Sequence, residues 1–351
     1  MKRALFTCVF LFAWALILPV FGQETISIFD STSFQLGEGV VLSKTSFRGL
    51  SVVNDSVIWV SGSRGTFAKS KDNGLSFYFR QLKAYPKSDF RDIEAFDANN
   101  AVMMSSGSPA YILITKDGGE NWKEVFKDTL PEMFLDAMDF WDSKHGIIVG
   151  DPIDKHFVLL ETKDGGLYWK IWDSINSPKA IDSEAVFAAS GTSLRCFGKN
   201  EFAFATGGKT PRLIQWTKEG KWETRNLTEF NLGLKSAGAF SFDRQGNQFI
   251  VVGGDYLRDQ LDSANTSYLP NYPGISKLSR VKGYRSSVEF INPPSKSLKA
   301  IACGTSGVDV LANNAWKTIS HESFNVVRKS KKGNAIFLAG SKGKIARLVI
   351  K

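Results

Sequence analysis

One octapeptide pattern occurs three times in the first half of the chain and limits the fold more than any other feature. Residues 70–77 (SKDNGLSF), 115–122 (TKDGGENW) and 162–169 (TKDGGLYW) share the form Ser/Thr-x-Asp-x-Gly-x-x-aromatic. The aspartates of successive copies are 45 and 47 residues apart. A period of this length indicates an array of similar supersecondary units rather than two unrelated domains.

Each octapeptide predicts a tight turn between two strands. The aspartate carboxylates, at Asp72, Asp117 and Asp164, are suited to accept hydrogen bonds from backbone N–H groups and from the Ser or Thr hydroxyl. The glycine supplies a positive φ, and the aromatic ring fits back between strands. We therefore expect these aspartates to have a structural role and no part in catalysis.

The sequence around each octapeptide repeats as well. A strand-like segment comes first, and a second segment ending in small residues follows it. The predicted first strands cover 47–53, 90–96 and 134–140, and the predicted second strands cover 57–62, 101–107 and 146–150. With one strand before and one after each octapeptide, every repeat has four short antiparallel strands, which is the blade of a β-propeller. The 31 Gly and the 13% of aromatic residues fit such an array.

Later repeats are degenerate, but they can be traced to the C-terminus. Altered turn motifs occur at 217–222 and 313–316, and the last repeat lacks one strand. A strand at 25–30, near the N-terminus, can supply it and close the ring. The sequence thus predicts an all-β fold, a seven-bladed β-propeller of four-stranded antiparallel blades closed by the N-terminal strand. Six or eight blades are the alternatives.

The N-terminus has the features of a secretory signal peptide, predicted over residues 1–22. Lys2 and Arg3 precede an uncharged apolar run at 4–20, and small residues follow at a plausible cleavage site. The alternative is an uncleaved anchor, because the run approaches the minimum length for spanning a bilayer. We expect cleavage, no stable membrane insertion afterwards, and a single propeller over 23–351 in the periplasm or outside the cell.

Charge is distributed unevenly along the chain. The formal net charge is +9, or about +7 without the predicted signal peptide, and residues 271–351 hold 15 Lys and Arg against three acids. Such a basic end is able to contact nucleic acid, anionic lipid or acidic glycan. We favour a solvated surface, with a charged hairpin turn at 328–333, and expect no nucleic-acid partner because the protein is predicted to be exported.

No cofactor or metal site is predicted. The three histidines are isolated and lack ligand spacing, and the chain has no dinucleotide-binding glycine motif, haem attachment motif or Gly-x-Ser-x-Gly. Cys196 and Cys303 lie in apolar strand-like runs, so free thiols are expected instead of a disulfide.

A family resemblance rests on several segments of the chain. Residues 46–53 (SFRGLSVV), 89–96 (DFRDIEAF), 187–192 (FAASGT) and 283–286 (GYRS) resemble exported propellers similar to photosystem II stability/assembly factors. The three octapeptides resemble the Asp-box, or BNR, repeats of sialidase-like propellers. The resemblance covers nearly the whole predicted mature chain and implies a propeller fold and a scaffold function. It fails at 270–274, where PNYPG replaces the expected turn motif.

Propeller geometry predicts where a site would form. Polar residues that flank the first strand of each blade, or follow its second strand, should converge at one mouth of the central channel. The predicted binding residues are Arg48, Arg64, Arg91, Asp92, Glu94, Asp136, Asp151, Glu184, Arg212, Asp255, Tyr256, Arg285 and Asp309. They are suited to bind a polar ligand, orient a sugar or hold a cation. The alternative is that they brace neighbouring blades as salt bridges.

Two function classes follow from this mouth. We expect a monomeric scaffold that binds a protein, peptide or glycan partner, in the manner of an assembly or stability factor. The alternative is a glycoside hydrolase or lyase that pairs Glu184 with Asp151 or Asp255 as catalytic carboxylates. The Phe/Tyr-Arg-Ile-Pro motif of sialidases is absent from the chain.

Overall fold

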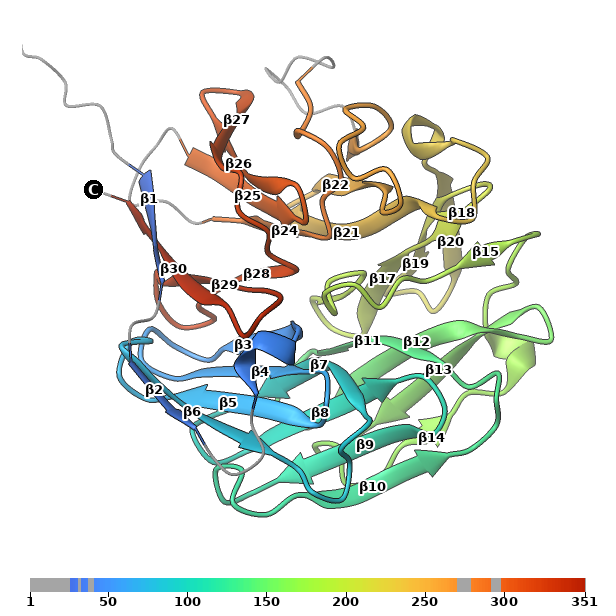
Figure 1. Ribbon diagram of the computed structural model, residues 1–351. Helices are drawn as coiled ribbons and strands as arrows, with labels where there is room; N and C mark the ends of the chain where they lie inside the picture. The colour runs from blue at the N-terminus through green and yellow to red at the C-terminus, as the bar shows by residue number, and fades with distance from the viewer. Residues whose placement is uncertain (1–25, 31–32, 37–40, 270–278, 292–297, 351) are drawn as a thin grey trace, which may run out of the picture.

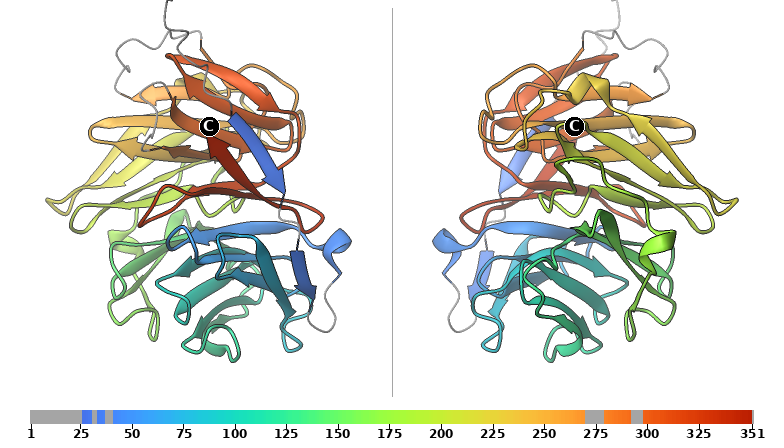
Figure 2. Two further views of the ribbon diagram at one scale, coloured as in Figure 1. Left: turned by 90° about the vertical axis from the view of Figure 1, so that its left-hand side faces the viewer. Right: turned by 90° about the vertical axis from the view of Figure 1, so that its right-hand side faces the viewer.

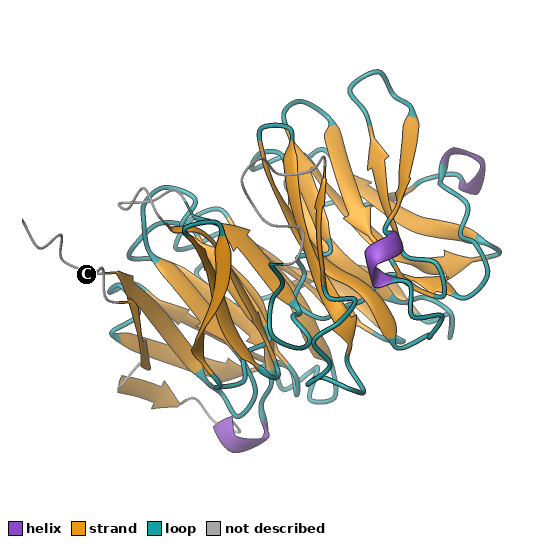
Figure 3. Cartoon of the chain, turned by 90° about the horizontal axis from the view of Figure 1, so that it is seen from above, coloured by secondary structure: helices purple, strands orange, loops and turns teal. Residues whose placement is uncertain are grey.

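Seven antiparallel sheets stand in a ring around a central channel in the computed structural model (Figure 1). The structure describes residues 26–30, 33–36, 41–269, 279–291 and 298–350. The predicted signal peptide and the whole of the 270–274 segment lie outside these residues. Strands dominate the described chain, with three short 3-10 turns at its edges (Figure 3). The prediction of a seven-bladed all-β propeller is confirmed.

The first three blades contain the three octapeptides. Blade 1 consists of β3 (Phe47–Val52), β4 (Ile58–Gly62), β5 (Thr66–Ser70) and β6 (Ser76–Gln81), with β2 (Ser33–Leu36) added parallel to β6. Blade 2 consists of β7 (Asp89–Ala95), β8 (Ala101–Ser106), β9 (Ala110–Thr115) and β10 (Lys123–Asp128). Blade 3 consists of β11 (Leu135–Phe140), β12 (Gly146–Ile153), β13 (His156–Thr162) and β14 (Lys170–Ile171).

Blades 4 and 5 are less regular. Blade 4 consists of β16 (Leu194–Phe197), β17 (Glu201–Ala205), β19 (Arg212–Trp216) and β20 (Trp222–Asn226). Blade 5 consists of β21 (Ala237–Gln245), β22 (Gln248–Asp255) and β23 (Thr266–Leu269), and its sheet also includes the two-residue strands β15 (Glu184–Ala185) and β18 (Gly207–Gly208). The 3-10 turns are η1 (Leu42–Lys44), η2 (Ser174–Asn176) and η3 (Thr228–Phe230).

The last two blades complete the ring. Blade 6 consists of β24 (Ser287–Phe290), β25 (Leu298–Gly304), β26 (Gly307–Ala312) and β27 (Ala315–Ser320). Blade 7 consists of β28 (Val326–Lys329), β29 (Ile336–Ala339) and β30 (Ile345–Ile350), and β1 (Ile26–Asp30) forms its outer strand. The two ends of the described chain lie side by side there (Figure 2). This pairing confirms the closure predicted from the sequence.

The core is divided into seven layers, one between each pair of neighbouring blades. Each layer is a hydrophobic cluster with residues from two adjacent sheets, and the cluster between blades 7 and 1 closes the circle. Trp59 and Phe67 of blade 1, for example, are buried against Phe90 and Leu113 of blade 2. Because successive side chains of a strand point to opposite faces, every sheet contributes to two layers.

The three octapeptides form the predicted turns. In the second turn Thr115 Oγ1 donates to Asp117 at 2.9 Å, and the Asn121 N–H donates to the same carboxylate at 2.9 Å. The N–H bond leads the interactions that lower the pKa of Asp117 to about 2. Asp72 and Asp164 accept the equivalent backbone bond at 3.0 Å. The aspartates are occupied within the turns, while the likeness to Asp-box repeats stays a prediction.

Candidate functional site in the central channel

The channel is lined by one inner strand from each blade: β3, β7, β11, β16, β21, β24 and β28. Small polar side chains on these strands accept hydrogen bonds from the backbone of the next blade. Ser51 accepts the Ala95 N–H at 3.0 Å, and Asp92 accepts the Met138 N–H at 2.8 Å. These bonds join neighbouring blades at the channel wall. From the sequence, the alternative was that salt bridges between charged residues would brace the blades.

A segment at 186–193, here called the channel segment, crosses the channel between β15 and β16. Ser190 Oγ donates to the Ser286 carbonyl of blade 6 at 2.6 Å, and Thr192 Oγ1 donates to Ser241 Oγ of blade 5 at 2.7 Å. Gly191 has a φ of 67°, and a Cβ there would lie 2.3 Å from the Asp92 carboxyl carbon of blade 2. Only glycine fits at this point. The channel segment therefore fills the middle of the channel.

One mouth of the channel opens into a cavity of about 460 Å³, here called the first cavity. Its wall contains the starts of several inner strands and the first half of the channel segment. Phe187 stacks on Phe240 with ring centroids 4.1 Å apart, and Tyr256 lies edge-on to both at the rim with 49% of its surface exposed. The cavity thus has an aromatic side that is open to solvent.

Two arginines line the same cavity. Arg48 donates to the Ala189 carbonyl at 3.0 Å, and Arg91 forms an ion pair with Asp89 at 2.8 Å and donates to the Ala188 carbonyl at 3.3 Å. Arg48 has no carboxylate within ion-pair distance in the described part of the chain. Burial, and then the charge of Arg91, lower the pKa of Arg48. An anion bound in the cavity would offset both the cost of burying the Arg48 charge and its repulsion by Arg91.

Two carboxyl groups, those of Asp136 and Asp151, belong to the wall of this cavity. Asp136 is fully buried, and neither of its oxygens forms a hydrogen bond of good geometry with a described residue, although the Ala188 and Asp151 backbones lie nearby. Burial, and then the charge of Asp151, raise the pKa of Asp136 well above its usual value. Asp151 accepts the Val186 N–H at 3.0 Å, and burial raises its pKa to about 6.

We expect the substitution Asp136→Asn to stabilise the protein at pH 8. Between the unfolded pKa and the raised folded pKa the folded protein binds more protons, so stability falls as pH rises through that window. Asparagine does not titrate, so the substitution removes the cost of holding a buried charge at pH 8, and we expect a gain of about 1–3 kcal/mol. At pH 4 the gain should vanish. Urea denaturation at both pH values measures it.

Asp182→Asn is the matched control, since the side chain of Asp182 is 86% exposed. It should leave the free energy of unfolding unchanged at both pH values. A gain in Asp136→Asn that is equal at pH 4 and pH 8 would contradict the proton-binding explanation.

Glu184, the first catalytic candidate, is held in a closed network. Arg212 Nε donates to one carboxylate oxygen at 2.8 Å and Arg212 Nη2 to the other at 2.5 Å. Thr206 Oγ1 and the Ile181 N–H add bonds of 2.6 Å and 2.9 Å. The Glu184 side chain is fully buried. This pair ties β15 to β19 and does not line the first cavity.

Four further predicted residues also lie away from the first cavity. Arg285 and Asp309 are fully buried and form an ion pair at 2.8 Å within blade 6. Asp255 is paired with Arg258 at 2.7 Å, and this bond contributes to lowering its pKa against the opposing effect of burial. Arg64 is exposed at the turn between β4 and β5. Of the proposed catalytic carboxylates, only Asp151 faces the cavity, so the structure does not bring Glu184 or Asp255 beside it there. The hydrolase alternative stays a prediction.

Two predicted residues lie deeper along the channel. Asp92 is buried beside Gly191, and burial raises its pKa to about 7. Glu94 lies at the far end of the same inner strand and lines a second cavity. The structure therefore brings five of the thirteen predicted residues to the first cavity: Arg48, Arg91, Asp136, Asp151 and Tyr256.

The sequence did not reveal the channel segment. Its small residues at 188–193 (AASGTS) neither alternate nor match a turn motif, so they carried no signal of a strand or a hairpin. They are small because the segment passes between inner strands on several sides. Among the described residues, no three His, Cys, Asp or Glu side chains are grouped to hold a metal ion. No helix in the described ranges has the length and apolar character of a membrane span.

No family model and no curated protein matches the chain. Solved structures do match. The structure of YCF48 bound to D1 peptide has a TM-score of 0.59 and 14% identity, covering 92% of this chain and 96% of its own. YCF48 from Cyanidioschyzon merolae has a TM-score of 0.59 and 12% identity, covering 91% and 98%. The Pan2 WD40 domain of Neurospora crassa has a TM-score of 0.56 and 13% identity, covering 86% and 88%. At these identities the likeness establishes the propeller fold that the chains share.

Proposed function

We propose that the protein is a scaffold that binds a peptide segment of a protein partner in the first cavity. The observation that carries this proposal is the Arg48 guanidinium, which faces the cavity without a carboxylate partner in the described chain. A carboxylate on a peptide would supply the missing charge, and charge-assisted hydrogen bonds to arginine are among the strongest available.

The aromatic side of the first cavity suits the same ligand. Exposed Tyr256 at the rim, and the stacked Phe187 and Phe240 beside it, offer an apolar surface next to the arginines. Aromatic and arginine side chains dominate the binding energy of protein interfaces. YCF48, a structural neighbour of this chain, has been solved bound to D1 peptide, which supports a peptide as the class of ligand. The predicted signal peptide supports a partner in the periplasm or outside the cell.

Arg48→Ala should weaken peptide binding by about 10–100-fold, the loss that accompanies removal of a hydrogen-bonded charge worth about 1.5–3 kcal/mol. The probes are fluorescently labelled octapeptides with one or two Glu beside an aromatic residue, compared with the same peptides carrying Gln. Fluorescence polarisation measures the Kd. The acidic set should bind more tightly, and Arg48→Lys should fall between wild type and Arg48→Ala.

Arg80→Ala is the matched control, because Arg80 lies on the outer strand β6 of the same blade and pairs with Glu120 at the surface. It should bind the peptides like the wild type. Equal affinity for the Glu and Gln peptides, or equal affinity of Arg48→Ala and wild type, would refute the proposed site. Thermal melting of each variant confirms that it is folded.

A further inference from the structure

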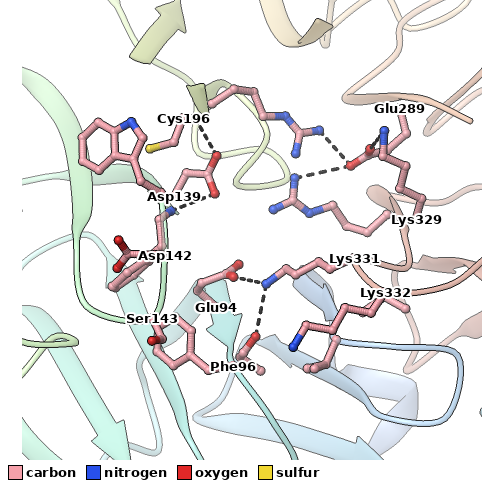
Figure 4. A pocket seen from close by; sticks show the side chains of 17 residues that line it. Glu94, Phe96, Asp139, Asp142, Ser143, Cys196, Glu289, Lys329, Lys331 and Lys332 are labelled. Carbon is pink, nitrogen blue, oxygen red and sulfur yellow. Dashed lines mark hydrogen bonds and ion pairs between the residues drawn. The ribbon is translucent and has the colours of Figure 1, made fainter. Parts of the chain in front are cut away.

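A second cavity of about 450 Å³ lies at the opposite end of the channel, where the inner strands end. Its wall includes Lys329 at the end of β28, Lys331 and Lys332 in the β28–β29 turn of blade 7, and Asp142 and Ser143 in the β11–β12 turn of blade 3. Figure 4 shows these two turns on opposite sides, with Glu94 between them. The basic turn predicted at 328–333 therefore borders a cavity rather than open solvent alone.

Two guanidiniums in this cavity share one carboxylate. Arg195 and Arg328 lie 2.9 Å and 3.4 Å from Glu289 Oε1, and their Nε atoms donate to the Phe242 and Leu50 carbonyls. Arg195 Nη1 and Arg328 Nη2 form no hydrogen bond with any residue that the structure describes. Neither nitrogen is among the solvent-excluded polar atoms, so both edges face the cavity.

The lysines add further positive charge. Lys329 Nζ lies 3.6 Å from Asp243 Oδ2 and 3.8 Å from Glu289 Oε2. It therefore shares Glu289 with the two arginines. Lys332 has no hydrogen bond or ion pair within the described ranges, and its side chain lines the cavity. The surrounding end of the chain, 271–351, has a large positive excess, which raises the local concentration of anions.

Glu94 lies beside the cavity, and it does not offer a binding group to a ligand. It is only 4% exposed, and one oxygen, Oε1, is paired with Lys331. The other oxygen, Oε2, has no partner among the residues described, but it is itself excluded from solvent and does not reach the cavity. The positive charge that remains open to a ligand therefore lies on the two arginine edges and on Lys332.

We propose that the second cavity binds the phosphate group of a small phosphate monoester. The phosphate oxygens would accept hydrogen bonds from the unpaired edges of Arg195 and Arg328 and from Lys332. Guanidinium edges match phosphate geometry, and a cavity of this volume holds a small ligand. The site is separated from the first cavity by the channel segment and does not depend on peptide binding.

Isothermal titration calorimetry with three probes tests the proposal. Inorganic phosphate and glycerol 3-phosphate should both bind, because both present a phosphate group to the arginine edges and Lys332. Glycerol should not bind. Lys332→Ala and Arg328→Lys should each weaken the binding of both anions by about three- to tenfold.

Two control variants test whether the anions bind in this cavity and nowhere else on the protein. Lys342→Ala removes an exposed lysine from another turn of blade 7 and should leave both affinities unchanged. Arg48→Ala should also leave them unchanged, so failure of the peptide site and of this site can be told apart. Absence of phosphate binding overturns the proposal, and so does an equal loss in Lys342→Ala and Lys332→Ala. Lys332 has no hydrogen bond or ion pair with a described residue, so Lys332→Ala should not disturb the fold. It therefore tests the site even if Arg328→Lys unfolds.

Discussion

A chain that begins at residue 31 is expected to lose the cooperative unfolding of the propeller. This truncation removes strand β1, whose residues from Ile26 to Asp30 pair with β30 from Ile350 to Ala346. At about 1 kcal/mol for each backbone hydrogen bond, a ladder of this length is worth several kcal/mol, a large part of the total stability of a domain. The deletion also exposes the edge of β30, which favours aggregation.

The matched control is a chain that begins at residue 23, which lacks the predicted signal peptide and keeps β1. It should unfold in one urea transition and elute as a monomer in size-exclusion chromatography. The shorter chain should unfold at a lower urea concentration and elute as oligomers or aggregates. A synthetic peptide of residues 23–31 added to the shorter chain should restore part of the urea midpoint. Identical midpoints for the two chains would show that β1 does not hold the ring closed.

The period of the octapeptides was enough to predict the ring. Blades 1 to 3 have strands within two residues of those predicted from the first two strands of each repeat, except that β12 runs on to Ile153. Local chemistry explains this success, because Asp117 and its glycines define a turn without help from distant residues. The parallel strand β2 and the channel segment were missed because neither repeats.

The charged residues of the channel were harder to predict, for a physical reason. A sequence places Glu184 near a mouth but does not reveal that Arg212 lies within 2.8 Å of it. Whether a charged side chain is available to a ligand depends on partners that arrive from other strands. Arg48 and Glu184 look alike in the sequence as charged residues beside strands. Only the structure shows that Arg48 lacks a carboxylate partner among the described residues, whereas Glu184 has four hydrogen bonds.

This distinction leads to the second large effect. Glu184→Gln should destabilise the protein by about 3–5 kcal/mol, because it leaves the largely buried Arg212 guanidinium without its carboxylate. Urea denaturation measures the loss. Glu120→Gln is the control, since Glu120 pairs with Arg80 at the surface with 67% of its side chain exposed, and it should cost less than about 1 kcal/mol.

The double variant Glu184→Leu/Arg212→Met separates the charge from the packing. Replacing both members of a buried pair by apolar residues removes the uncompensated charge, so the double variant should recover most of the stability that Glu184→Gln loses. If the free energy of unfolding of Glu184→Gln instead lies within about 1 kcal/mol of the wild-type value, the pair with Arg212 contributes little to stability. A bidentate pair with two further hydrogen bonds argues for the structural role.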